Sequence, residues 1–236
     1  MNLSVSYYTT KGGRSSNEDS ISLLENKDNT LAMVADGLGG HQDGAVASES
    51  AVRVLNHRLT GRALDPGELE AAIEAANEEI SRCQEEHPGM KTTLALLWLD
   101  KQCAYAAHVG DSRIYQFRNK ALVFQSIDHS VSQMAVMVGE ITADQIRGHK
   151  DRNKLVRALG AAKQVKPDIR ELEVFPGDAF LLCTDGFWEL ITEAQMQEAL
   201  SYCATANEWL LKMRQRVDQR SGAKSDNQSA VAIIIQ

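Results

Sequence analysis

Apolar runs of strand length follow one another with only a few turn residues between them, and this spacing restricts how the strands can pair. The separating segments are "DKQ" at 100–102, "RNK" at 118–120 and "PGD" at 176–178. Parallel neighbours need a crossover of a dozen or more residues, whereas antiparallel strands can close over a two-residue turn. We therefore predict antiparallel hairpins at these places. The predicted strands are 3–8, 20–25, 30–35, 93–99, 103–109, 113–118, 121–126, 169–175, 178–184 and 229–235.

Several segments carry the signals of a helix start. Asp65 is followed by proline and, three residues on, by Glu68, which resembles a capping box with proline at the first helical position. Similar starts occur at Thr142, Thr192 and Thr205, and a further helix is expected over 44–59. Many antiparallel strands together with one-sided helices predict an α+β fold, in which two sheets pack together with helices outside.

The composition fits one globular domain over residues 1–236 and excludes some partners. The net charge of −7 argues against general binding to nucleic acid or to an anionic membrane surface. The N-terminus has no signal-peptide pattern, and the longest apolar runs are too short to insert into a bilayer. The four cysteines form no C-x-x-C pair, which is typical of reduced thiols in a cytoplasmic protein.

Aspartates recur at the ends of predicted strands. "LAMVADG", "AAHVGDS" and "FLLCTDG" each place an Asp and a small residue after an apolar run. A single Asp-Gly is more often a turn, but three repeats of one pattern weaken that interpretation. Clustered carboxylates repel one another unless cations or protons lie between them. A further acidic cluster is "SDN" at 225–227. Oxygen ligands suit Mg²⁺ or Mn²⁺, so Asp36, Asp185 and Asp226 are candidate metal ligands.

The stretch "VADGLGGH" at 34–41 also allows a phosphate cradle. A dinucleotide fingerprint needs a third glycine where this sequence has Gln42, and no Walker motif occurs. That alternative is therefore weak. A metal site could instead use the backbone carbonyl of Gly37, where no side chain intrudes.

Two divalent ions that share a carboxylate can promote displacement at phosphorus if a cation grips the phosphate and an acid protonates the leaving group. Arg14 is the candidate for the first task, because a guanidinium matches the forked geometry of phosphate. His41 is the candidate acid. Each residue alone is better explained as a surface or loop position, and only its place beside the acidic clusters favours catalysis.

The motifs taken together resemble those of the PP2C-like metal-dependent serine/threonine protein phosphatases in their compact bacterial form. The motifs are "RSSNEDS", "VADGLGGH", "HVGDSRIY", "IDHS", "RALG", "TDGFWE" and "SDNQSAV", and they cover essentially the whole chain in order. The resemblance implies a four-layer α-β-β-α sandwich with the metal site at one edge of the sheets. It also implies hydrolysis of phosphoserine and phosphothreonine by a metal-bridging hydroxide, without a phosphoenzyme.

The resemblance also implies roles for individual residues. Asp36 would bridge two Mg²⁺ or Mn²⁺ ions, with the Gly37 carbonyl, Asp185 and Asp226 completing the site. Glu18 would assist through water and Asp19 would lie behind the ligands. The set Asp111, Asp185 and Glu189 would hold a third, weaker ion. Arg14 would bind phosphate, and His41 would be the general acid.

Residues 130–157 would form a flap beside the site, whose basic residues are either a solvated face or a dock for a phosphoprotein. The expected partners are phosphorylated proteins and a cognate serine/threonine kinase, and the expected state is a monomer. Two departures from the family pattern are Lys91 and Asp43; the second lies close to His41 and would tune its pKa. Two other functions stay open: a non-catalytic pseudophosphatase, and a metal-dependent hydrolase of other phosphate esters.

Overall fold

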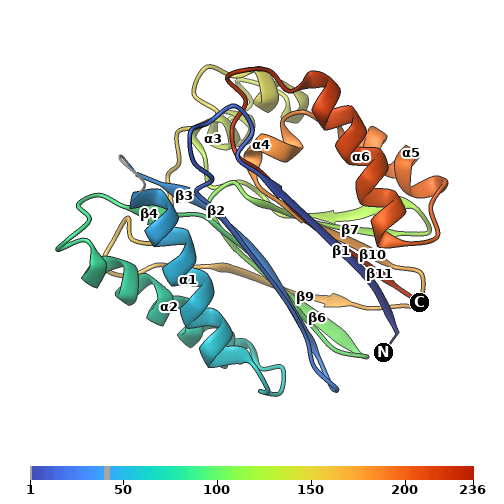
Figure 1. Cartoon of the computed structure of the whole chain (residues 1–236), viewed down its shortest axis with the longest axis horizontal. Helices are drawn as coiled ribbons and strands as arrows, with labels where there is room; N and C mark the ends of the chain where they lie inside the picture. Colours follow the sequence, from blue (N-terminus) through green and yellow to red (C-terminus); the bar gives the residue numbers. More distant parts are fainter. Residues whose placement is uncertain (1, 40–42) are drawn as a thin grey trace.

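The computed structural model describes residues 2–39 and 43–236 and contains two antiparallel sheets (Figure 1). One sheet has the order β1 (Leu3–Thr10), β11 (Gln228–Ile235), β10 (Ala179–Cys183), β7 (Arg113–Arg118) and β8 (Ala121–Gln125). The other has the order β2 (Asp19–Glu25), β3 (Thr30–Leu38), β5 (Leu94–Leu99), β6 (Cys103–Val109) and β9 (Asp168–Glu173), with the short β4 (Lys91–Thr92) paired to the end of β3. All ten predicted strands are present.

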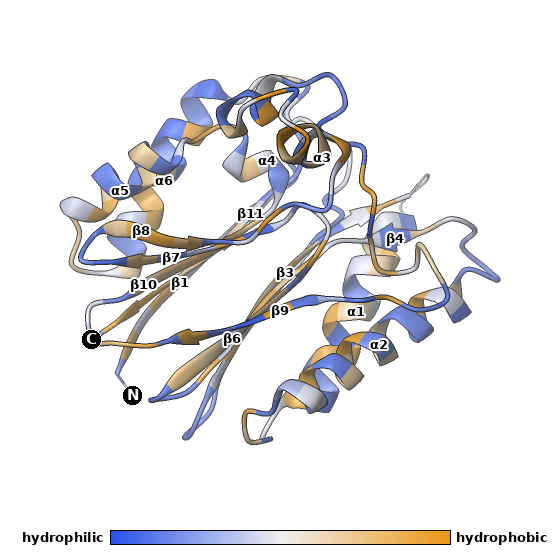
Figure 2. Cartoon of the chain, turned by 180° about the vertical axis from the view of Figure 1, so that it is seen from behind, coloured by the Kyte–Doolittle hydropathy of each residue, from blue (hydrophilic) through white to orange (hydrophobic). Residues whose placement is uncertain are grey.

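Helices cover the outer face of each sheet, as Figure 1 shows. The helices are α1 (Asp43–Leu59), α2 (Pro66–Cys83), α3 (Val131–Met137), α4 (Asp185–Trp188), α5 (Glu193–Ser201) and α6 (Ala206–Arg220), and η1 (Ala143–Gly148) is a 3₁₀ helix. Leu55 and Ile73 of α1 and α2 pack on the second sheet, and Trp209 of α6 packs on the first. Figure 2 shows that hydrophobic and hydrophilic residues follow one another along these helices, and core residues such as Leu55 and Trp209 form their buried side. The predicted α+β sandwich of two antiparallel sheets flanked by helices is therefore confirmed.

A third apolar layer fills the space between the sheets. It includes Leu97 from one sheet and Phe180, Leu182 and Val231 from the other, all fully buried. The continuous run in β11 follows from this position, because one of its faces meets the partner sheet and the other meets the helices. The sandwich holds its strand ends rigidly and so positions any side chain at its edge.

One predicted hairpin is wrong. The segments at "DKQ" and "RNK" do connect neighbouring strands, and Asn119 and Lys120 have positive φ values of 51° and 67° in the second turn. The strands on either side of "PGD", however, belong to different sheets. The chain crosses between the sheets there, and the buried Asp178 holds the crossing by accepting hydrogen bonds from Phe175 N and Arg118.

A helix begins at each predicted helix start, but one of these helices is a 3₁₀ helix and not an α-helix. Asp65 Oδ1 accepts a hydrogen bond from Glu68 N at 2.8 Å, and Thr192 and Thr205 both form capping boxes. The segment after Thr142 forms the 3₁₀ helix η1, which ends at Gly148. The prediction missed β4, α3 and α4 because none is long enough to show a period. Among the described residues, no helix combines the length and apolar character needed to cross a membrane.

Candidate metal centre

An acidic cleft of about 310 Å³ lies at the edge of the sandwich where β3 and α4 meet the loop before β11. Most of the predicted site residues line this cleft: Arg14, Glu18, Asp36, Gly37, Asp111, Asp185 and Asp226. Asn153 and Leu155 of the segment 130–157 close one side of it. His41, the candidate acid, lies outside the described residues. The folding of the chain thus brings together carboxylates that are as far as 208 positions apart in the sequence (Glu18 and Asp226: 226 − 18).

Asp36 lies within β3 and not after its end, because the strand continues to Leu38. Its backbone is fixed on both sides. The Asp36 N–H donates to Thr93 Oγ1 at 2.9 Å, and the Asp36 carbonyl accepts from Thr92 Oγ1 at 2.8 Å and from Thr93 N at 2.9 Å. Rigid strand backbone therefore carries the carboxylate that was predicted to bridge two ions.

Asp185 and Asp19 are connected through Thr184. Asp185 is the first residue of α4, and the hydroxyl of Thr184 just before it donates to Asp19 Oδ2 at 2.9 Å. The other oxygen of each carboxyl, Oδ1, is buried and has no hydrogen-bond partner within the described part of the chain. Buried carboxylate oxygens normally have partners, so these two atoms are the expected signature of a cation-binding site.

Burial and mutual repulsion raise the pKa of the clustered aspartates. The pKa values of Asp19 and Asp185 rise to about 7, chiefly through burial. The pKa of Asp36 lies well above its usual value, first because of burial and then because of the charge of Asp185. The pKa of Asp111 is raised in the same way. Such a cluster is stable only when it holds protons or positive charge, and divalent cations would supply that charge.

Gly37 has a packing role that the sequence did not suggest. A Cβ atom there would overlap the Gly44 carbonyl in the first turn of α1, and it would come within 2.6 Å of the Glu18 carbonyl oxygen. The absent side chain therefore lets α1 pack directly against β3 and β2. Gly44 in turn lies against the carboxylate of Glu18. The two glycines bring Glu18 close to Asp36.

Arg14, the candidate phosphate ligand, contacts a candidate metal ligand. Its Nη2 atom lies 2.6 Å from Asp226 Oδ2, and its side chain is 56% exposed. The guanidinium supplies positive charge to Asp226. It can reach the cleft from solvent, which a phosphate-binding group requires.

Asp111 lines the cleft, whereas Glu189 is not among its lining residues, and both make contacts that sequence reasoning missed. The Asp111 carbonyl accepts a hydrogen bond from the buried indole N–H of Trp188 at 2.9 Å. The Trp188 ring lies beneath the guanidinium of Arg113, whose Cζ is 3.4 Å from the ring centroid. Glu189 accepts from Arg152 Nε at 2.6 Å. The motif "TDGFWE" contained the signal, since Trp188 stands between two predicted ligands.

Asp43 and the basic residues of the segment 130–157 form ion pairs that the sequence did not predict. Asp43 pairs with His87 Nδ1 at 2.8 Å, so a described neighbour already uses the carboxylate that was expected to tune His41. Four cations of the segment 130–157 also form ion pairs: Arg147 with Glu193, Arg152 with Glu189, Lys154 with Asp151 and Arg157 with Asp168. These pairs favour a structural role for most of that basic charge.

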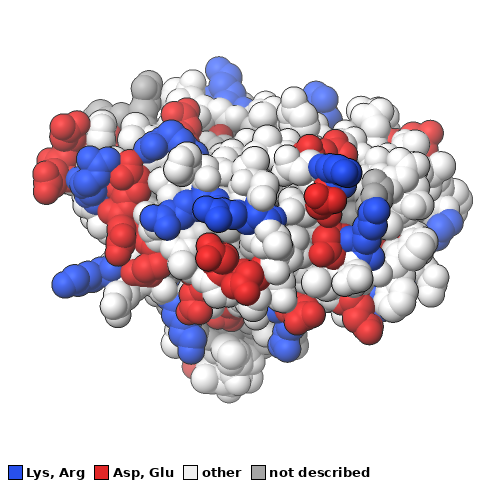
Figure 3. Space-filling model, turned by 90° about the horizontal axis from the view of Figure 1, so that it is seen from below, with Lys and Arg blue, Asp and Glu red and all other residues white. Residues whose placement is uncertain are grey.

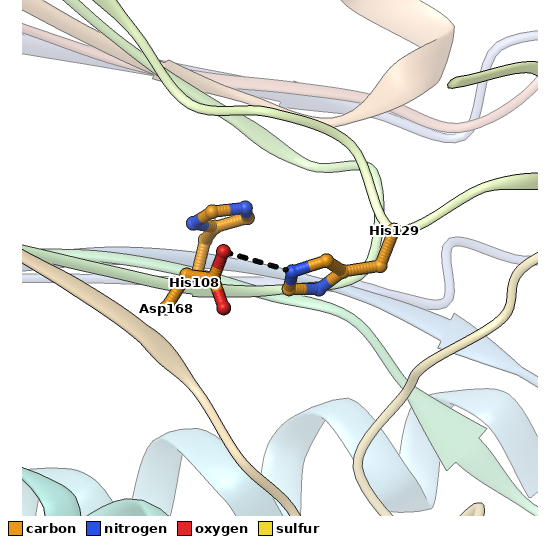
Figure 4. Close-up of side chains that lie close together, drawn as sticks. All are labelled: His108, His129 and Asp168. Atoms are coloured by element: carbon orange, nitrogen blue, oxygen red, sulfur yellow. Dashed lines mark ion pairs between the residues drawn. The ribbon is translucent and has the colours of Figure 1, made fainter. Parts of the chain in front are cut away.

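A second cluster of potential ligands, His108, His129 and Asp168, has a structural explanation (Figure 4). The two rings stack with an interplanar angle of 12°, so their in-plane lone pairs do not converge on one point. His129 Nδ1 accepts from the Gly110 N–H at 3.0 Å, and its Nε2 faces Asp168 at 3.5 Å. The cluster thus supports the turn that carries Asp111.

Charged side chains of both signs are mixed on one face of the molecule. Figure 3 shows acidic and basic side chains there in small neighbouring groups.

Comparison with known proteins assigns the family. Residues 11–225 match the family model for protein phosphatase 2C. A serine/threonine phosphatase stp of Listeria monocytogenes is 37% identical over 205 residues, which cover 83% of this chain and 81% of that protein. The structure of the S. agalactiae serine/threonine phosphatase is 27% identical, with a TM-score of 0.89 and all of both chains covered. The catalytic domain of the phosphatase PstP, solved in complex with two manganese ions, is 29% identical, with a TM-score of 0.84 and all of both chains covered. The chain belongs to the protein phosphatase 2C family and is a metal-dependent serine/threonine protein phosphatase.

Proposed function

We propose that the acidic cleft is the catalytic centre and that it holds two Mg²⁺ or Mn²⁺ ions. Asp36, the Gly37 carbonyl, Asp185 and Asp226 would hold the ions, with Asp36 shared between them, and Glu18 would assist through water. Asp19 stands behind the ligands. The observation that carries the proposal is the pair of buried carboxylate oxygens, Oδ1 of Asp19 and of Asp185, for which the described residues offer no hydrogen-bond partner. Asp111 and Glu189, with Asp185, are proposed for a third, weaker ion.

When bound, the ions supply a water of lowered pKa and neutralise the charge that develops on the phosphoryl group. The chain's own residues orient the substrate. The Arg14 guanidinium binds two phosphate oxygens, and its ion pair with Asp226 is then either broken or kept alongside the phosphate. His41 protonates the serine or threonine alkoxide, which is a poor leaving group at neutral pH.

The proposed substrates are proteins that carry phosphoserine or phosphothreonine and that a cognate serine/threonine kinase modifies. The cleft is open to solvent and lined by Arg14 and Asn153, so a phosphorylated side chain on an extended segment could enter it. A cytoplasmic location and a monomeric state remain part of this proposal, and both follow from the sequence only.

The test is phosphate release from a phosphothreonine peptide by the purified full chain with Mn²⁺. We expect release that EDTA abolishes and that Asp36→Asn lowers by a factor of about 10³ or more, because one change removes a ligand shared by two ions. Asp28→Asn, an exposed aspartate in the turn between β2 and β3, is the matched control. Metal-independent release, or full activity of Asp36→Asn, would contradict the proposal.

A further inference from the structure

We propose that a cationic pocket beside the catalytic cleft, with Lys91 as its main charge, receives an acidic side chain of the substrate. The inference rests on the function proposed above and adds a preference for substrates whose phosphorylated residue has an anionic neighbour. The anion is either a carboxylate or a second phosphate on the same segment.

The pocket is continuous with the cleft but opposite in charge. It has a volume of about 330 Å³ and shares Leu38, Gly39, Asn153 and Leu155 with the cleft. The described residues that line the cleft include five carboxylates. Those that line the pocket include Lys91 and Arg157 and no carboxylate. A substrate segment that places its phosphate in the cleft would therefore pass from an acidic site into a basic one.

β4 holds Lys91 in register with β3, the strand that carries Asp36. Lys91 lies directly opposite Leu38, and Leu38 is two residues beyond Asp36 on β3. Directly opposed residues and residues two apart share one face of a sheet, so Lys91 lies on the Asp36 face. Two residues of strand span about 7 Å. In an extended substrate segment, two side chains that are two residues apart are separated by a similar distance.

Lys91 supplies charge that is not already used. None of the ion pairs formed between described residues involves it, and it is partly exposed. Arg157, by contrast, donates to Asp168 Oδ1 at 2.9 Å and to the Lys166 carbonyl at 2.8 Å. These contacts hold the Arg157 side chain in place at the side of the pocket, while the Lys91 ammonium can turn toward a ligand. A partly exposed ammonium in a pocket whose described lining holds a second cation and no carboxylate favours an anion.

The test uses phosphothreonine peptides that differ at one position, measured with Mn²⁺ and the full chain. A single Glu or Gln is moved through the positions from three before to three after the phosphothreonine, and a second set carries phosphoserine there instead. For each position the measured quantity is the ratio of kcat/KM for the anionic peptide to kcat/KM for the Gln peptide. The two sets separate a carboxylate from a phosphate as the preferred anion.

We expect this ratio to be about 3 at one or two positions, the size of a single exposed ion pair. It should fall to about 1 in Lys91→Gln, fall below 1 in Lys91→Glu and return in Lys91→Arg. Lys101→Gln, an exposed lysine in the turn between β5 and β6, should keep the wild-type ratio.

Two outcomes would overturn the inference and leave the phosphatase function intact: turnover of all peptides with no preference at any position, or a preference that Lys91→Gln retains. Absence of Mn²⁺-dependent release from every peptide would instead remove the proposed function itself. The Gln peptides also report whether each variant is folded and active.

Discussion

Asp19 and Asp36 lie directly opposite each other in the antiparallel β2–β3 pair, so their carboxyl groups lie on the same face of the sheet. Like charges in directly opposed positions destabilise a sheet. Asp185 and Asp226 nevertheless lie beside them, and their charges raise the pKa of Asp36 further. Without metal ions, the carboxylates therefore repel one another, and bound cations would remove this repulsion.

The metal-free protein should lose stability as the pH rises from 6.5 to 8. The pKa values of Asp19 and Asp185 are raised to about 7 in the fold, so their contribution is complete below the unfolded pKa and is lost as pH rises through 7. His108 and His129 have lowered pKa values and act in the opposite sense, but only below about pH 6.5. Thermal unfolding in EDTA should show a falling Tm, and Mn²⁺ should stabilise more at pH 8 than at pH 6.5. A flat profile in EDTA would contradict this.

Asp36→Asn should change stability and activity in opposite directions. It removes one charge from the repulsive cluster, so the free energy of unfolding in EDTA at pH 8 should rise by about 1 kcal/mol or more, since a single pKa unit is worth that amount. The same variant should lose most of the Tm increase that Mn²⁺ gives the wild type. If Asp36→Asn is less stable than the wild type in EDTA, the carboxylate is not repelled by its neighbours.

Much of this arrangement could be predicted from the sequence, and the reasons for the gaps are physical. The acidic motifs pointed to Asp36, Asp185 and Asp226, and these three residues do line one cleft, because the sandwich brings the ends of its strands and the adjoining loops to one edge. The pairing of Asp19 with Asp36 depends on strand register, which no local pattern reveals. The ion pair of Asp43 and His87 joins the start of a helix to a loop that is distant in the sequence, and the local sequence of neither segment predicts this contact.

Short elements also escaped the sequence analysis. β4 has two residues and α4 has four, so neither can show a period. Yet β4 carries Lys91 and α4 carries Asp185. The length of the "PGD" segment predicts a hairpin, but the chain crosses between the sheets there. The contacts of Asp178 with Phe175 and Arg118 decide otherwise, and they exist only once both sheets have formed.

The buried ion pair of Arg113 and Asp128 should dominate local stability near Asp111. Both side chains are at most 3% exposed, and two hydrogen bonds of 2.8 and 2.7 Å join them. Asp128→Asn leaves the guanidinium charge buried without its carboxylate partner at 2.7 Å, and Glu193 lies farther away at 3.5 Å, so it should cost about 3 kcal/mol. Urea unfolding measures this. The double variant Arg113→Met, Asp128→Leu should recover part of the loss, because it removes both charges; an additive loss would count against the pair.

His41→Ala should impair peptide hydrolysis far more than hydrolysis of an aryl phosphate. A phenolate with an electron-withdrawing group leaves without protonation, whereas a serine or threonine alkoxide needs a proton. We expect a loss of about 10²-fold in kcat for the phosphothreonine peptide and a much smaller loss for the aryl phosphate. Equal losses on both substrates would assign His41 to binding or folding and not to proton donation.

Gly37→Ala should disrupt the site through packing. The added Cβ would overlap the Gly44 carbonyl and press on the Glu18 carbonyl oxygen, and both obstacles are backbone atoms that cannot rotate away. α1 would have to move off β3, which costs more than ordinary overpacking of a core; we expect at least about 3 kcal/mol. Gly222→Ala, in a loop where a Cβ meets open space, is the matched control. If Gly37→Ala unfolds at the wild-type urea concentration yet fails to bind Mn²⁺ by calorimetry, the glycine serves the metal directly; if it is destabilised, close packing of α1 on β3 is its main requirement.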